Sequence, residues 1–285
     1  MRILVLGVTG MLGSAVFKTL AQDASHEAWG TLRSGAGLAY FTEADHDRLI
    51  AGVDVLDHDS LVQVFNRIRP DAVVNCVGLI KQLSNAQDPL IALPINSMFP
   101  HRLARLCDLA KVRLVHISTD CVFSGRKGRY LESDVSDAED LYGKSKYIGE
   151  LHSYPHAITL RTSIIGQELS SRNALIDWFL GETGSIRGFS KAIFSGLPTV
   201  ELARVIKDFV LPDKSLAGLY HVAAEPISKL DLLRLVADEY EKEIEIRPDD
   251  SVEIDRSLNG HRFSAATGYV APGWPELIQT MRQGV

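Results

Sequence analysis

A turn rich in glycine near the N-terminus constrains the fold of this chain more than any other feature. Gly7, Gly10 and Gly13 directly follow a short apolar run and open a stretch with helical periodicity. Glycine permits a tight turn at the first position, close approach of a pyrophosphate at the second, and close helix–strand packing at the third. The amides at such a helix start bind phosphate. The turn therefore predicts a dinucleotide site formed by Gly7, Thr9, Gly10, Met11, Leu12 and Gly13.

The first half of the chain alternates between two periodicities. Short apolar runs, typical of buried parallel strands, occur at residues 3–6, 72–77, 112–117 and 157–160, with further strands expected at 27–32 and near Val53. Helical patterns lie between them, at 11–21, 61–68 and 95–109. Such alternation produces a parallel sheet with right-handed crossovers. We therefore predict an α/β fold with a Rossmann-type doubly wound parallel sheet.

The pattern loosens after about Thr162. We expect helices at 173–180, 200–210 and 230–241, and short strands at 218–222 and 243–246. No flexible linker separates the two halves. We predict a dinucleotide-binding domain over 1–162 and a smaller α/β C-terminal substrate lobe over 163–285, with segments of the lobe interleaved with the first domain.

Charge and cysteine content exclude several classes of function. The net charge of −6 provides no general attraction to nucleic acid or to an anionic membrane, so we expect neither as a partner. The three cysteines form no C-x-x-C pair, and the nine histidines show no ligand spacing, so we expect neither disulfides nor a metal. Apolar runs are too short to span a bilayer. We expect a cytoplasmic protein with reduced thiols.

The residues after the second strand favour NADP as the cofactor, with NAD as the alternative. An NAD site presents a carboxylate to the ribose about twenty residues after the glycine turn. This sequence has Arg33 there, which can pair with a 2′-phosphate, although a solvated loop arginine has the same appearance. Asp54 and Val55 are placed to contact adenine. Small residues at Cys76, Val77 and Gly78 would let the cofactor lie across the sheet edge.

Three residues in the middle of the chain form the predicted catalytic group. Thr119 closes the strand that begins near Val112, and Tyr142 and Lys146 share one face of a helix, one turn apart. A phenol titrates near ~10, and a nearby ammonium should lower that value. We expect Tyr142 to transfer a proton, Lys146 to lower its pKa and contact the nicotinamide ribose, and Thr119 to hold the reacting oxygen.

These motifs, taken in order, resemble the extended short-chain dehydrogenase/reductase superfamily, and within it the dTDP-4-dehydrorhamnose reductase branch. The segments Ile117-Ser-Thr-Asp-Cys-Val-Phe-Ser-Gly125 and Leu160-Arg-Thr-Ser-Ile-Ile-Gly166 are similar to that branch's motifs. The resemblance implies reduction of the 4-keto group of a nucleotide-activated deoxysugar, and it carries over Thr119, Tyr142 and Lys146 as the catalytic set.

Several positions depart from the branch. Ile164 replaces a tryptophan expected near the sugar, and Ala15 replaces a glutamate described as a metal ligand at a dimer interface, so a magnesium-linked dimer is not expected. Asp120 is followed by Cys121, whereas sugar-nucleotide dehydratases have glutamate there. The missing glutamate argues against dehydration, which needs a second acid or base. Cys121 is interpreted as a small apolar filler.

The predicted substrate contacts are Lys81, Asn96, Thr119, Asp120, Ile164 and Arg256. Simpler roles remain open for three of them: a solvated lysine at position 81, a helix cap at Asn96, and a surface ion pair at Arg256. Two other functions also stay open. One is a sugar-nucleotide 4-epimerase or epimerase/reductase with tightly held NAD; the other is a non-catalytic regulatory subunit. The sequence identifies neither the sugar nor the nucleotide, and it leaves monomer and homodimer as alternatives.

Overall fold

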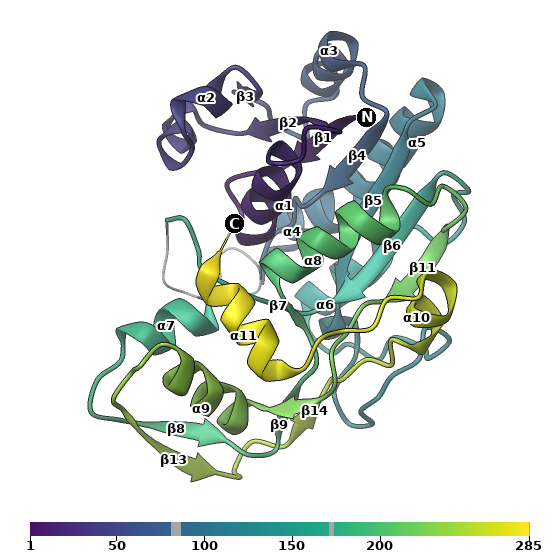
Figure 1. Cartoon of the computed structure of the whole chain (residues 1–285). Coiled ribbons are helices and arrows are strands. Elements are labelled where there is room, and N and C mark those ends of the chain that lie inside the picture. Colours follow the sequence, from purple (N-terminus) through teal and green to yellow (C-terminus); the bar gives the residue numbers. More distant parts are fainter. Residues whose placement is uncertain (81–86, 171–173, 285) are drawn as a thin grey trace.

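The apolar runs of the first half form one large parallel sheet (Figure 1). The computed structural model describes residues 1–80, 87–170 and 174–284. The sheet has seven strands in the order β11-β6-β5-β4-β1-β2-β3, and every neighbouring pair is parallel. The strands are β1 (Arg2–Leu6), β2 (Glu27–Leu32), β3 (Leu49–Ala51), β4 (Ala72–Asn75), β5 (Arg113–Thr119), β6 (Ala157–Thr162) and β11 (Gly218–His221). The predicted α/β fold with a doubly wound parallel sheet is confirmed.

The strand order reverses next to β1. The chain passes from β1 to β2 and β3 on one side, and then returns to place β4 on the other side of β1. In open α/β sheets, ligands bind outside the carboxyl ends of the strands at such a switch point. The glycine turn follows β1 directly, so it lies at this position.

Helices cover both faces of the sheet. Side chains of β1 alternate between two cores: Ile3 and Val5 lie in one, Leu4 and Leu6 in the other. The first core includes α1 (Met11–Ala21), α8 (Thr199–Val205) and the π-helical turn η5 (Ile206–Val210), and the second includes α3 (His58–Ile68) and α5 (Phe99–Ala110). Burial on both faces explains why these strands are continuous apolar runs rather than alternating ones.

The helix expected at 95–109 has a more complex start. It is preceded by α4 (Pro89–Ala92) and by a π-helical turn, η3 (Leu93–Met98), that leads directly into α5. Pro94 and Pro100 stand at the beginning of η3 and α5. Proline lacks the backbone N–H that an α-helical hydrogen bond requires, and a π-helical turn is one way to accommodate the loss.

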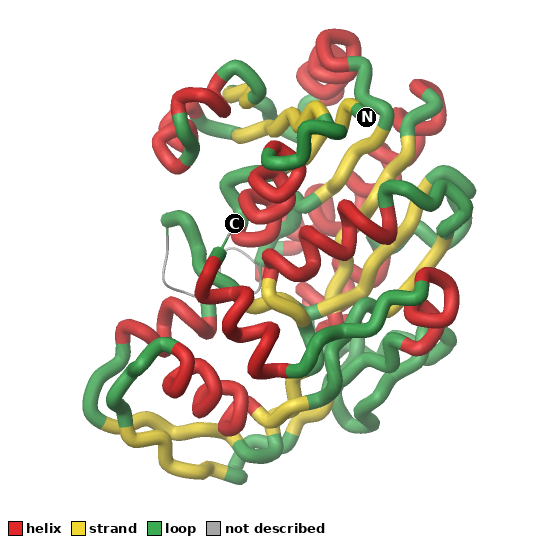
Figure 2. The backbone as a smooth tube through the Cα atoms, in the orientation of Figure 1, coloured by secondary structure: helices red, strands yellow, loops and turns green. Residues whose placement is uncertain are grey.

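The remaining elements form a smaller group at the carboxyl end of the sheet, seen as short strands and helices in Figure 2. Strands β8 (Ser185–Phe189) and β13 (Glu245–Asp249) pair in parallel, β9 (Ala192–Phe194) lies between β12 (Ile227–Ser228) and β14 (Ile254–Asp255), and β7 (Ile164–Ile165) pairs with β10 (Leu197–Pro198). The helices of this group are α7 (Leu175–Gly181), α9 (Lys229–Glu239) and α11 (Trp274–Gln283), whereas α10 (His261–Thr267) lies against β11 at the edge of the main sheet (Figure 1). Strand β11 and helix α8, from the predicted second lobe, lie in the main sheet and against α1.

The short strand expected near Val53 is β3, which ends at Ala51, and Val53 donates its N–H to Leu32 O at 3.2 Å. One predicted strand boundary was wrong. The strand expected over 72–77 ends at Asn75, because the Asn75 side chain accepts the Val77 N–H at 3.1 Å and turns the chain. None of the helices among residues 1–80, 87–170 and 174–284 is long and apolar enough to cross a lipid bilayer.

Candidate active site

The glycine turn has the shape that a pyrophosphate requires. Gly7 has φ of +83°, and a Cβ there would lie 2.9 Å from Val77 Cγ2. A Cβ on Gly13 would lie 2.1 Å from Gly7 O, so helix α1 packs against the turn only with glycine at that position. A Cβ on Gly10 would meet only Gly7 O, at 3.4 Å. The fold therefore demands glycine at Gly7 and Gly13, whereas at Gly10 it leaves space above the backbone for a ligand.

The start of α1 is suited to an anion. Gly10 is the N-cap residue and provides no side-chain hydrogen bond, and no acidic residue stands in the first helical turn. The first amides of a helix lack partners within the helix, and its dipole favours negative charge. Thr9, Met11 and Leu12 complete this turn as expected, so the residues present fit the phosphates of a dinucleotide.

Arg33 lies next to the glycine turn at the same sheet edge. It follows β2 directly and is exposed. The end of β2 is held to the turn by Thr31, whose backbone O accepts the Val8 N–H at 3.1 Å. The following 3₁₀ helix η1 (Gly35–Tyr40) approaches so closely that a Cβ on Gly37 would lie 2.7 Å from Thr9 Cγ2. Arg33 therefore lies at the sheet edge that carries the glycine turn, where the sequence predicts the adenosine ribose of the cofactor.

The predicted adenine contacts, and the small residues predicted to let the cofactor lie across the sheet edge, stand beyond strand ends rather than within strands. Asp54 and Val55 follow β3 and precede α3, and Asp54 Oδ1 accepts the Leu56 N–H at 2.9 Å, which forms a turn. Cys76, Val77 and Gly78 follow β4. A Cβ on Gly78 would lie 3.6 Å from Lys146 Nζ. This places Gly78 beside the predicted catalytic lysine.

The three predicted catalytic residues lie together. Thr119 ends β5, and Tyr142 and Lys146 lie on α6 (Leu141–Ile148), which begins where Asp140 Oδ1 accepts the Gly143 N–H at 2.7 Å. The Thr119 side chain lies close enough to the Tyr142 phenol to lower its pKa. The Lys146 ammonium donates to Ile117 O at 2.7 Å, so it is fixed against β5 near the same strand end. Thr119, Tyr142 and Lys146, which are separated in the sequence, thus form one cluster in the fold.

The expected lowering of the Tyr142 pKa was wrong. Burial raises the pKa of Tyr142, and Cys121 and two nearby carboxylates raise it further, against a lowering effect of the Thr119 side chain. Burial also lowers the pKa of Lys146 itself, to about 8, against the opposing effects of Glu150 and Cys76. Tyr142 is consequently a protonated acid at neutral pH.

Asp120 and Arg256 join this cluster from two directions. Thr119 Oγ1 donates to Asp120 Oδ1 at 3.1 Å, at the start of the 3₁₀ turn η4 (Asp120–Val122). Arg256 Nε donates to Phe123 O at 2.7 Å, so its guanidinium lies next to η4. Burial raises the pKa of Asp120, and Arg256 opposes that effect. Burial raises the pKa of Cys121 to about 12, which keeps its thiol protonated, in agreement with a filler.

The other predicted substrate residues have different surroundings. Asn96 does not begin a helix; it is buried inside η3, donates Nδ2–H to Leu79 O at 3.2 Å and to Ser145 Oγ at 3.1 Å, and accepts the Leu79 N–H at 2.8 Å. It therefore fixes α6 to the loop after β4. Ile164 lies in β7, directly after β6. Lys81 lies outside the described residues.

The sequence interpretation missed a buried charged cluster beneath the catalytic residues. The Glu150 carboxylate accepts from Ser118 Oγ at 2.7 Å and from Arg161 through Nε and Nη2, both at 2.7 Å. Glu150 and Arg161 are 3% and 1% exposed, so neither charge is solvated. An arginine inside the apolar run of β6 was the signal that could have revealed the cluster, because a buried arginine requires a partner.

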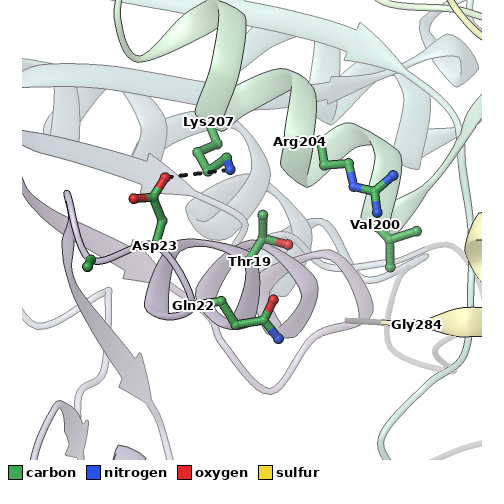
Figure 3. Close-up of a pocket in the computed structure, with 8 residues that line it drawn as sticks. Thr19, Gln22, Asp23, Val200, Arg204, Lys207 and Gly284 are labelled. Carbon is green, nitrogen blue, oxygen red and sulfur yellow. Dashed lines mark ion pairs between the residues drawn. The ribbon is translucent and has the colours of Figure 1, made fainter.

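Two surface hollows lie away from the predicted catalytic residues. One, of about 420 Å³, is formed by the end of α1 together with α8 and η5, and it contains the ion pair between Lys207 and Asp23 (Figure 3). The other, of about 530 Å³, borders the edge of β11 and includes His152 and Arg262. Neither is lined by a predicted catalytic or cofactor residue. Among the described ranges, no group of three or more acidic, cysteine or histidine residues could hold a metal.

Comparisons with known proteins show the family and the fold of the chain. Residues 1–266 match the family model described as RmlD substrate binding domain. The "Probable low-salt glycan biosynthesis reductase Agl14" of Haloferax volcanii is 28% identical over 78% of this chain and 74% of the relative. The "Methionine adenosyltransferase 2 subunit beta" of Danio rerio is 30% identical over 84% and 74%. A dTDP-4-dehydrorhamnose reductase structure from Bacillus anthracis, in complex with NADP, superposes with a TM-score of 0.79 at 22% identity, over 99% and 98% of the two chains.

Proposed function

This chain belongs to the RmlD substrate binding domain family, within the extended short-chain dehydrogenase/reductase superfamily, and on that premise we propose that it is an NADPH-dependent sugar-nucleotide reductase. Its substrate is the 4-keto form of a nucleotide-activated deoxysugar. The observation that carries the proposal is the cluster of Thr119, Tyr142 and Lys146, which lies beside Gly78 at the carboxyl end of the parallel sheet, the edge that also carries the glycine turn. A non-enzymatic use of the fold would not require this cluster.

Each residue has a defined task in this reaction. NADPH, when bound, supplies the hydride for the carbonyl carbon. Tyr142 Oη donates its proton to the carbonyl oxygen, a role that suits a phenol whose pKa is raised by burial. Thr119 holds that oxygen beside Tyr142, and Lys146 binds the nicotinamide ribose next to Gly78. Arg256, beside η4, is placed to bind the diphosphate of the substrate.

The preference for NADPH follows from Arg33. An exposed guanidinium at the end of β2, with no carboxylate in its place, favours a 2′-phosphate over a free ribose hydroxyl. The Bacillus anthracis neighbour, which was solved with NADP, supports the same choice.

Oxidation of NADPH in the presence of a panel of 4-keto sugar nucleotides tests the proposal. The wild-type protein should consume NADPH only with substrate, and Tyr142→Phe should lower kcat by about 10²–10⁴ because the proton donor is lost. Tyr147→Phe is the matched control, because Tyr147 lies on the same helix with 39% of its surface exposed and should keep full activity. Equal activity of all three proteins would exclude the assigned role of Tyr142.

A second candidate function is that of a non-catalytic subunit in an enzyme assembly. The Danio rerio relative favours it, because that protein is named as a subunit rather than as a reductase. In this case, no member of the panel would stimulate NADPH oxidation, and Tyr142→Phe would leave the biological function intact in a complementation assay. Substrate-dependent oxidation that requires Tyr142 would exclude it.

A further inference from the structure

A second charged residue, Glu150, stands two positions beyond the end of the catalytic helix α6 at Ile148. The side chains of Lys146 and Glu150 both reach the same short stretch of β5. Lys146 Nζ donates to Ile117 O at 2.7 Å, and the next residue, Ser118, donates its hydroxyl to Glu150 Oε1 at 2.7 Å. The ammonium and the carboxylate are therefore anchored to consecutive residues of β5, and Glu150 raises the pKa of Lys146.

Glu150 is ionised despite its burial. Burial alone would raise its pKa, but hydrogen bonds from Arg161, His152 and Ser118 outweigh that effect and hold the pKa below its ordinary value. Arg161 makes the largest contribution among these partners through a two-pronged contact, Nε to Oε1 and Nη2 to Oε2. Such a fork fixes both the charge and the orientation of the carboxylate.

The other side of Arg161 is fixed by the protein as well. Its guanidinium lies over the Phe123 ring, 5.1 Å from the centroid, and Nη1 lies 3.3 Å from His221 Nε2. The Nδ1 atom of His221 faces Tyr130 O at 3.0 Å, so Nδ1 carries the proton and Nε2 accepts from Arg161. Arg161 therefore has partners on three sides and cannot turn away from Glu150.

We propose that Glu150 is a positioning residue of the active site that supplies the counter-charge for the Lys146 ammonium, and that Arg161 keeps Glu150 ionised and in place. Without such a partner, a buried lysine loses its proton near neutral pH. Glu150 opposes this loss, and it is the leading contribution that does so. The importance of Lys146 for turnover rests on the proposed function, whereas the charge relation between Lys146 and Glu150 does not.

Titration of the Lys146 amine by NMR tests this proposal without substrate or cofactor. The full-length protein is labelled with carbon-13 at the ε position of lysine, and the Lys146 signal is assigned by its absence in Lys146→Arg. We expect a midpoint at about pH 8 in the wild type. In Glu150→Gln the midpoint should fall by about one to three pH units, because the counter-charge is lost. A wild-type midpoint below neutral pH, or an unchanged midpoint in Glu150→Gln, would overturn the proposal.

Two further variants keep the test decisive. Glu150→Gln leaves Arg161 without its carboxylate partner, and this variant can fail to fold. The double variant Glu150→Gln/Arg161→Met therefore removes both charges. The Lys146 midpoint of the double variant should also lie below that of the wild type. His152→Gln is the control, because His152 contacts the same carboxylate from the exposed side, at 3.1 Å, and the midpoint should not change. An equal decrease in His152→Gln would overturn the proposal, because the change would then reflect general disturbance of the cluster.

The kinetic consequence separates this inference from the proposed function. If the chain is a reductase, the alkaline limb of the pH profile for kcat/KM should move to lower pH in Glu150→Gln, together with the NMR midpoint. An NMR decrease without any reductase activity in the wild type would refute the function and leave the charge relation intact. Activity whose pH profile is the same in wild type and Glu150→Gln would refute the role of Glu150 alone.

Discussion

The three positions of the N-terminal turn hold glycine for different physical reasons. Gly7 needs glycine for its backbone angle, and Gly13 for the contact between α1 and the turn. At Gly10 the angle is ordinary, with φ of −78°, and a methyl group would meet nothing closer than 3.4 Å. The fold itself does not require glycine at position 10. Under the proposed function, the reason for glycine there is the close approach of the cofactor's pyrophosphate.

A pair of alanine substitutions separates these reasons. Gly10→Ala should change the free energy of unfolding by about 1 kcal/mol or less, while it weakens NADPH binding by about tenfold or more, a loss of 1.4 kcal/mol or more. Gly13→Ala should destabilise the fold by about 1–3 kcal/mol or more, because its methyl group would lie 2.1 Å from Gly7 O. Thermal unfolding and fluorescence titration with NADPH measure the two effects. The same loss of stability in both variants would contradict this division.

Arg33 provides a prediction about cofactor choice. Arg33→Ala should raise the Kd for NADPH by about tenfold to a hundredfold, the effect of losing a charge-assisted contact with a phosphate. The Kd for NADH should stay the same, because NADH has no 2′-phosphate. Isothermal titration with both cofactors measures this difference. Equal weakening of the two would show that Arg33 acts on the structure of the loop instead.

The sequence predicted the placement of the candidate catalytic residues better than it predicted their electrostatics. Spacing alone placed Tyr142 and Lys146 on one helix face, because that relation is local. The direction of the Lys146 side chain depends on Ile117 O, which belongs to a strand 29 positions away. The pKa of Tyr142 depends likewise on burial by the whole site. Neither the direction of the Lys146 side chain nor the pKa of Tyr142 can be obtained from the local spacing of these two residues.

At the scale of elements, strand β6 is both an inner strand of the sheet and the element that holds the buried Arg161. Its residues are buried throughout, as expected of an inner strand, yet Arg161 stands within it. The apolar pattern correctly predicted the strand, but it carried no information about which carboxylate the arginine would meet. Glu150 stands in the same stretch of sequence as the catalytic helix, eleven positions before Arg161, so a search for buried ion pairs around β6 would have identified it.

The ion pair between Glu150 and Arg161 gives a stability prediction. Arg161→Met alone should lower the free energy of unfolding by about 3–5 kcal/mol, because it leaves a buried carboxylate without its partner. The double variant Glu150→Gln/Arg161→Met should be less destabilised than the single one, since both charges are then removed. Urea unfolding of the wild type, the two single variants and the double variant measures the difference. A double variant as unstable as the sum of the two single variants would show that the two residues act independently.

At the scale of the whole molecule, the main sheet is completed by a late segment. Strand β11 pairs with β6, although 55 residues separate Thr162 from Gly218. The contacts of His221 with Arg161 and Tyr130 add further links between the two halves. The predicted interleaving of the lobe with the first domain is compatible with this arrangement. Local periodicity could not have specified which strand pairs with β6, because that neighbour is determined by the folded topology.

The fragment 1–162 should therefore not fold as an independent unit. Its last strand would have an open edge, and Arg161 would lack His221. We expect no cooperative thermal transition by circular dichroism, and association of the fragment at moderate concentration. The full chain, measured under the same conditions, is the control. A fragment that unfolds cooperatively, with a Tm close to that of the full chain, would contradict this expectation.

The position of β11 also has a consequence for biosynthesis. A ribosome produces the glycine turn and the catalytic helix early, but the partner of β6 leaves the exit tunnel only after a further stretch of chain has been translated. During that interval, the nascent protein presents an unpaired strand edge and a charged pair with an incomplete shell. This is the period in which a chaperone that shields strand edges would benefit the chain most, and in which crowded synthesis would most readily cause misassembly.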